Sequence, residues 1–192
     1  MGVYFTAYQG VMLGVNALKD AVETVTSIDT KMRDLRRVTD DATNEQLNNF
    51  PIQANQMAIA LGQTTENAIQ ATTVWKQLGY SWKDATEYLS KESMILSNVG
   101  DMTAEDSTNA LVSTLKAFKL EAKDTTTVVD SLNEAGNRFA IKTGELAEGL
   151  RVGGASLAIA NNSLQQSEAL IITGTEVLRD SNEVSNGLNL GR

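Results

Sequence analysis

The sequence contains no cysteine and no histidine among its 192 residues. Without cysteine, the chain cannot form a disulfide, a thiolate nucleophile or a cysteine-ligated metal site. Histidine is the side chain used most often for proton transfer near neutral pH and for binding transition metals. The two absences argue against an enzyme, and we expect no catalytic, cofactor-binding or metal-binding residue.

Proline and aromatic residues are also scarce. Pro51 is the single proline, and aromatic residues make up 5% of the chain. Proline interrupts helices and aromatic residues favour strands, so the scarcity of both favours helices. An apolar content of 42% is sufficient for a hydrophobic core. The composition therefore predicts an all-α protein.

Positive charge is in deficit: the formal net charge is -8 and the sequence pI is about 4.6. Nucleic-acid binding depends largely on clustered lysine and arginine, so we expect no specific nucleic-acid binding. One basic cluster does occur, at Lys31, Arg33, Arg36 and Arg37, but it is interleaved with Asp29, Asp34, Asp40 and Asp41. We interpret it as the solvated, mixed-charge face of a helix.

The first 42 residues have the pattern of one long amphipathic helix. Apolar residues recur at steps of three and four, the spacing that places side chains on one helix face. They are Val11, Val15, Leu18, Val22, Val25, Ile28, Met32, Leu35 and Val38. A coiled-coil-like helix over residues 3–41 would be roughly 55 Å long. We expect part of it to protrude or to mediate self-association. Its most apolar stretch is too short for stable membrane anchoring.

From residue 43 onwards the pattern changes to short helices with frequent stop signals. Helices are predicted over residues 44–61, 64–78, 81–100, 103–120, 122–139, 143–160 and 163–178. Turns of two to five residues would join them, which is typical of antiparallel neighbours. Pro51 would kink or split the first of them. We expect residues 43–192 to form a compact helical core domain.

The stretch GDMTAEDSTNALVSTLKAFKL, residues 100–120, illustrates these signals. Thr103 followed by Asp106 has the pattern of a capping box, which starts a helix. Leu111, Leu115 and Phe118 then fall on one face of that helix. We expect this face to be buried.

Two other features have a structural and a functional interpretation. Trp75 and Trp82 flank the turn sequence QLGYS and could form an aromatic cluster that locks one helix to the next. If they were exposed instead, they would form a docking patch, and the protein would be an α-helical adaptor or effector module. The run VGGASLAIA, residues 152–160, favours close helix packing over an anion-binding glycine nest.

Signals for catalysis are weak. Ser113 to Lys116 reads STLK and Lys142 to Gly144 reads KTG, two elements of penicillin-recognising enzymes. The Ser-Asp-Asn element of those enzymes is missing, and no strand is predicted to carry KTG. Carboxylates such as Glu145 and Glu148 fall in first turns of helices, where the helix dipole explains them. A hydrolase of cell-wall polymer would rest on such scattered carboxylates alone.

Five stretches, taken in order, resemble the core region of phage tail tape-measure proteins. They are ALGQTTENAIQA (60–71), LGYSWKDATEYLS (78–90), the stretch 100–120 quoted above, VVDSLNEAGNRFAIKTGELAEGL (128–150) and GTEVLRDSNEVSNGL (174–188). The resemblance covers residues 58–188 and extends more loosely from residue 22. No single stretch is specific, but their order is.

This resemblance implies a segment of a longer virion or prophage protein that lies in the lumen of the tail tube. In that family the chain is a helical scaffold and ruler, around which tube subunits assemble with the help of tail chaperones in the host cytoplasm. It is ejected before the DNA. Implied partners are tail-tube, tail-tip and tail-chaperone proteins. A ruler needs many hundreds of residues, so we expect these 192 residues to be a fragment.

Overall fold

The computed structural model describes residues 24–178 and 180–190, and all regular structure in these two ranges is helical. The prediction of an all-α protein is confirmed. A helix over residues 24–38 comes first. It is followed by α2 (Asn44–Leu61), α3 (Thr65–Gln77), α4 (Trp82–Asp84), the π-helix η1 (Ala85–Leu89), α5 (Ser90–Gly100), α6 (Ala104–Phe118), the 3₁₀-helix η2 (Ala122–Asp124), α7 (Thr125–Arg138), α8 (Thr143–Ile159), α9 (Leu164–Leu178) and α10 (Ser181–Leu190).

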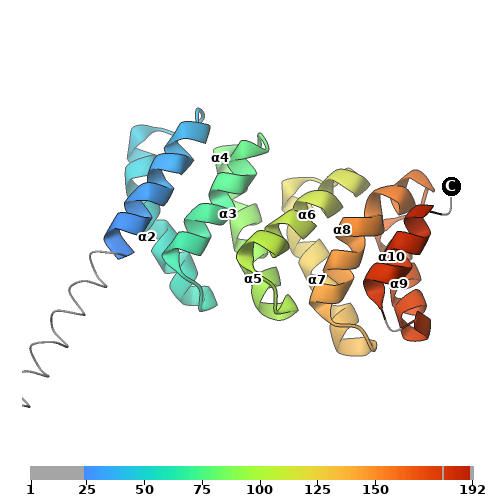
Figure 1. The fold of residues 1–192 in the computed structure, drawn as a ribbon. Coiled ribbons are helices and arrows are strands. Elements are labelled where there is room, and N and C mark those ends of the chain that lie inside the picture. The colour runs from blue at the N-terminus through green and yellow to red at the C-terminus, as the bar shows by residue number, and fades with distance from the viewer. Residues whose placement is uncertain (1–23, 179, 191–192) are drawn as a thin grey trace, which may run out of the picture.

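The helices follow one another along the molecule in chain order. The helix over residues 24–38 lies with α2 at one end, and α9 and α10 lie at the other (Figure 1). Near the second end, α8 packs against α6 on one side and against α9 and α10 on the other. Most packing is thus between elements that are close in sequence.

Local capping signals place most helix ends where the sequence predicts them. Thr43 and Gln46 form a reciprocal capping box at the start of α2, and Gly62 ends it in the left-handed conformation at φ 65°. Only residues without a steric penalty adopt this conformation easily, which explains the glycine. Pro51 lies inside α2 without splitting it. Ser163 and Gln166 exchange the predicted capping hydrogen bonds before α9.

The structure differs most from the prediction near the two ends of the described chain. The first described helix ends at residue 38 and not at residue 41. Helix α10 was not predicted at all. It begins directly after Asp180, whose Oδ1 accepts a hydrogen bond from the backbone N–H of Glu183 at 3.1 Å. Its sequence carries few apolar residues, so its periodic signal is weak.

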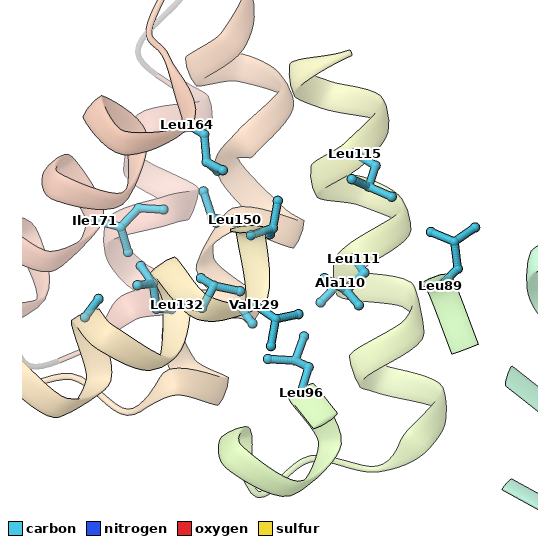
Figure 2. Close-up of a cluster of buried hydrophobic side chains, with 14 of the residues drawn as sticks. Leu89, Leu96, Ala110, Leu111, Leu115, Val129, Leu132, Leu150, Leu164 and Ile171 are labelled. Atoms are coloured by element: carbon cyan, nitrogen blue, oxygen red, sulfur yellow. The ribbon is translucent and has the colours of Figure 1, made fainter. Parts of the chain in front are cut away.

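Among the described residues, the larger of two hydrophobic clusters, the main cluster, is built from α3 to α9. Figure 2 shows a part of it. Leu111 and Leu115 of α6 lie at its centre, 0% and 1% exposed, and Phe118 packs at its edge. The predicted burial of this helix face is therefore confirmed. Val129 and Leu132 of α7 meet it from the opposite side (Figure 2).

The smaller cluster, the N-terminal cluster, joins the helix over residues 24–38 to α2 and α3. It contains Met32, Leu35, Leu47, Phe50, Ala54, Ala68, Ile69, Trp82 and Met94. Met32 and Leu35 belong to the predicted coiled-coil-like seam, so this part of the seam is covered by the chain itself. Val25 in the same seam is 67% exposed. Val11, Val15, Leu18 and Val22 lie outside the described residues.

One helix contains an irregular turn. Between α4 and α5 the backbone widens into η1, where the N–H of Ser90 bonds to the carbonyl of Ala85. The Ser90 hydroxyl donates to the same carbonyl at 2.6 Å and lies 2.8 Å from the hydroxyl of Thr72 on α3. Single π-turns of this kind are rare within helices. Here the turn brings a buried polar side chain against the neighbouring helix.

Candidate functional site

The two tryptophans flank the turn between α3 and α4, with Trp75 in α3 and Trp82 at the start of α4. Trp75 is 0% exposed in the main cluster, and Trp82 is 6% exposed in the N-terminal cluster. Trp75 meets Tyr80 edge-to-face at 5.1 Å between ring centroids, and its Nε1 donates to Ser93 Oγ at 3.0 Å. Trp82 meets Phe50 edge-to-face at 5.0 Å. Each indole thus anchors a different cluster.

The burial of both tryptophans confirms the structural interpretation and excludes the alternative of an exposed docking patch. Both rings are used inside the fold, and no indole face is left for a partner helix. The adaptor or effector interpretation, which depended on that patch, loses its basis. The structural interpretation is correct in locking neighbouring helices, although two clusters are involved and not one.

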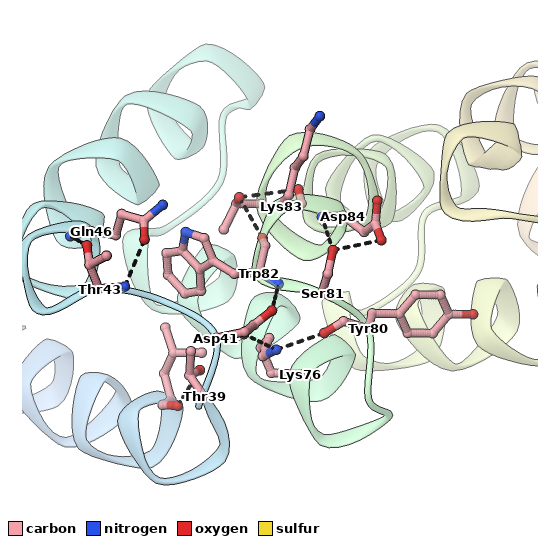
Figure 3. A network of polar contacts seen from close by, with 12 residues as sticks. Thr39, Asp41, Thr43, Gln46, Lys76, Tyr80, Ser81, Trp82, Lys83 and Asp84 are labelled. Carbon is pink, nitrogen blue, oxygen red and sulfur yellow. Dashed lines mark hydrogen bonds and ion pairs between the residues drawn. The ribbon is translucent and has the colours of Figure 1, made fainter.

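A polar network ties this same turn to the connection before α2 (Figure 3). The Nζ of Lys76 lies 2.5 Å from Oδ1 of Asp41 and donates to the carbonyl of Tyr80 at 2.8 Å. Oδ2 of Asp41 accepts the backbone N–H of Trp82 at 2.6 Å. The Lys76 side chain is only 4% exposed. Because every one of these contacts is internal, the network is suited to structure and not to binding.

The small-residue run in α8 is a packing surface, as predicted. A Cβ added at Gly153 would lie 3.3 Å from the Cβ and the backbone oxygen of Ser185 on α10. A Cβ at Gly154 would lie 3.4 Å from the ring of Phe118 on α6. One turn earlier, Gly149 faces Ile171 and Ser185 at 3.0 Å. Glycine lets α6, α9 and α10 approach the α8 backbone closely.

The residues of the penicillin-recognition pattern are part of the helical packing. Lys142 precedes α8, and Thr143 and Gly144 form its first turn, whereas the pattern requires a strand at this place. Gly144 lies against Gly100, with a hypothetical Cβ only 2.2 Å from the Gly100 oxygen. This arrangement does not build an acylating site.

Glu145 and Glu148, together with Asp101, line one hollow of about 260 Å³ beside Gly100 and Met102. Glu145 accepts the N–H of Lys142 at 3.3 Å, and Glu148 pairs with Arg151. Asp101 ends α5 in the left-handed conformation. Two of the carboxylates are thus engaged in local contacts. Within residues 24–178 and 180–190, no group of three or more carboxylates could hold a metal ion.

The basic cluster on the first described helix is a mixed-charge face, as predicted. Arg33 and Arg37 pair with Asp29 and Asp34 at 3.5 and 3.8 Å. Lys31 donates to Gln70, and Arg36 donates to Asn48. Each of these four cationic side chains has an acidic or amide partner, so together they do not form a free phosphate-binding patch.

Another hollow, of about 460 Å³, lies where the end of α6 meets the start of α9. Phe118, Leu120 and Leu164 form its apolar wall, and Lys119 and Asp124 lie at its margin. Both polar and apolar groups face it, without a converging set of reactive side chains. We assign no chemistry to it.

Two buried acids were not identified from the sequence. Glu92 on α5 and Glu168 on α9 are each 5% exposed. Hydroxyl groups of α7 donate to them: Thr126 to Glu92 at 3.0 Å, and Ser131 to Glu168 at 2.6 Å. Burial raises the pKa of both carboxyl groups above the ordinary value, and each hydrogen bond opposes that rise. Glutamate is usually exposed, so residue type gave no signal for their burial.

No helix in the described part of the chain has the length and apolar character needed to cross a membrane.

Comparison with known families gives one match over most of the chain. Residues 53–189 match a family described as phage-related minor tail protein. This range begins in α2 and continues into α10, so it includes the whole main cluster, whereas Met32, Leu35, Leu47 and Phe50 of the N-terminal cluster precede it. No solved structure matches the chain.

Proposed function

Since the chain belongs to the phage-related minor tail protein family, we propose that it is part of a tail tape-measure protein. In this role it is a structural scaffold and ruler for assembly of the tail tube, and it leaves the tail before the DNA. The observation that carries the proposal is the ordered set of stretches between residues 60 and 188 that resembles the tape-measure core. The family match covers nearly the same range.

The character of the molecule supports a structural, non-enzymatic role. Most of its buried side chains pack one helix against another. The residues considered as catalytic candidates include Lys142 and Glu145, and these two form the capping box of α8. A net charge of -8 opposes adhesion to DNA that travels through the same tube. Both properties suit a scaffold that must separate from the nucleic acid.

The proposed location is the lumen of the tail tube in the virion, and the host cytoplasm during assembly. The proposed partners are tail-tube, tail-tip and tail-chaperone proteins. We also propose that residues 43–192 form the core domain, with residues 1–42 as an extension whose described end packs on it through Met32 and Leu35. Self-association would use the N-terminal part of that extension. Val25 is the first exposed seam residue of the described chain.

The ruler role is tested by duplicating residues 44–190 in frame in the parent phage gene and measuring tails by electron microscopy. If the added segment extends as helix along the tube, the tail lengthens by up to roughly 220 Å, at about 1.5 Å per residue. Deletion of the same residues is the reciprocal test and should shorten the tail. Tails of unchanged length in the duplication would contradict the ruler role.

Self-association is tested separately by sedimentation velocity of the purified protein over a range of concentrations. A Val25→Glu variant should weaken association, because it places a charge on the exposed part of the seam. Ile52→Glu is the matched control, since Ile52 is 62% exposed but lies on α2 outside the seam. A wild-type protein that stays monomeric at every concentration would exclude this partner proposal.

A further inference from the structure

A groove of about 320 Å³ lies between α7 and α9, near the C-terminal end of the helix row. Its apolar wall includes Ala135, Phe139, Ala169 and Ile172. Phe139 is 49% exposed, although it is a large aromatic side chain. The groove is open enough to admit a side chain from outside, and its wall favours an aliphatic one.

Glu168 lines this groove, and only one of its two carboxylate oxygens has a hydrogen-bond donor in the described part of the chain. The residue is 5% exposed, and Ser131 Oγ donates to Oε2 at 2.6 Å. Oε1 is buried and has no hydrogen-bond partner among the described residues. A buried charged oxygen without a donor is unfavourable, because it has lost its hydration without replacement. The site therefore lacks one donor.

The charged side chains that line the groove are Glu134, Arg138 and Glu168. Arg138 lies one turn from Glu134 and pairs with it, with Nη2 2.6 Å from Oε1. Arg138, the single cation among the described lining residues, is thus engaged at the rim, and these residues together carry a net negative charge. A positively charged group would complement it.

We propose that this groove binds a lysine side chain inserted by a partner protein. The aliphatic stem packs on Phe139, Ala169 and Ile172, and the Glu168 carboxylate turns its buried Oε1 toward the groove to accept a hydrogen bond from the ammonium. Lysine fits better than arginine, because only one carboxylate oxygen is free and the planar fork of arginine is suited to two. The long stem of lysine also lets its methylene groups pack on the apolar wall while the ammonium reaches the carboxylate. The inference does not depend on the proposed role as a ruler.

The test uses the ¹⁵N-labelled full chain and Nα-acetyl-lysine methylamide as the probe, followed by two-dimensional NMR. Saturable shifts are expected for backbone amides around the groove, such as those of Phe139 and Ala169. Nα-acetyl-norleucine methylamide has the stem without the ammonium, and should bind about tenfold more weakly. Equal binding of the two probes, or no saturable shift with the lysine probe, would overturn the proposal.

Two variants locate the contact. Glu168→Gln should weaken binding of the lysine probe about tenfold, because the charge at the buried end is removed. Glu134→Gln is the matched control at the rim and should change binding less than about twofold. Equal losses in the two variants, or full binding to Glu168→Gln, would contradict the assigned contact. The comparison of the two probes on wild-type protein decides the question even if a variant does not fold.

Discussion

The ammonium of Lys76 and the carboxylate of Asp41 lie 2.5 Å apart, although they are separated by 35 positions in the sequence. Asp41 belongs to the connection between the first described helix and α2, and Lys76 lies near the end of α3. The pair therefore joins the connection before α2 to the end of α3, two segments that are not adjacent in the sequence. The loss of protein stability should depend on which partner is removed, because the Lys76 side chain is buried and the Asp41 side chain is partly exposed.

Replacement of Asp41 by asparagine should lower the free energy of unfolding by about 2 kcal/mol at neutral pH, because it leaves the buried Lys76 charge without its counter-ion. Losses of fully buried pairs are larger, but the Asp41 side chain is 38% exposed and water can partly replace it. Urea unfolding followed by circular dichroism measures the change. Lys76→Met is the control and should cost less, because the remaining carboxylate is solvated. If Asp41→Asn left the free energy of unfolding unchanged, the pair would not stabilise the fold.

The same pair predicts a pH dependence. Burial alone would raise the pKa of Asp41, but hydrogen bonds from Lys76 and the Trp82 backbone outweigh it and lower the pKa. The contribution is then fully present above the unfolded pKa of about 4 and is lost as the pH falls through the lower folded value. The difference in stability between wild type and Asp41→Asn should shrink in acid. A difference that stays constant down to pH 2 would exclude this linkage.

Glu168 should show the opposite pH dependence. Burial raises its pKa in the folded state, so the folded protein binds the proton more tightly than the unfolded chain. Its contribution is most favourable below the unfolded pKa of about 4.3 and declines as the pH rises through the folded value. Relative to wild type, Glu168→Gln should therefore gain stability between pH 4 and pH 7. Glu134→Gln, with a 58% exposed side chain, should not show this gain.

The two tryptophans allow the cooperativity of the helix row to be measured. Trp75 reports on the main cluster and Trp82 on the N-terminal cluster. Because α3 carries residues of both clusters, we expect the two to unfold together. Single-tryptophan variants Trp75→Phe and Trp82→Phe should give fluorescence transitions that coincide with circular dichroism for each variant. Separate fluorescence and circular dichroism midpoints within one variant would show that the clusters are independent units.

Local signals explain how much of this fold the sequence predicts. Thr43 and Gly62 fix the ends of α2 by capping alone, and the step of four from Leu111 to Leu115 correctly identifies a buried face. Helix α10 is different, because it forms where Val184 and Ser185 meet glycines of α8 and α9. That surface exists only after the preceding helices have packed, so no local pattern encodes it.

The buried acids follow the same reasoning. Neither Glu92 nor Glu168 differs from a surface glutamate in its local sequence, and each is buried by helix packing at a place where a hydroxyl of α7 donates to it. Likewise, the sequence marks Trp75 and Trp82 as important but does not say which side of a helix is covered. Candidate sites of this kind require the tertiary arrangement, since periodicity within one helix cannot show them.

Gly144 provides a test of the close packing between α5 and α8. An added Cβ would lie 2.2 Å from the backbone oxygen of Gly100, a group that cannot rotate away. Gly144→Ala should therefore destabilise the protein by about 1–3 kcal/mol, the usual effect of overpacking, despite the better helix propensity of alanine. Gly187→Ala in α10 is the matched control, because nothing lies within 4 Å of its added Cβ. That variant should gain about 0.5–1 kcal/mol. If both substitutions stabilise the protein in urea unfolding, the contact between Gly100 and Gly144 is looser than described.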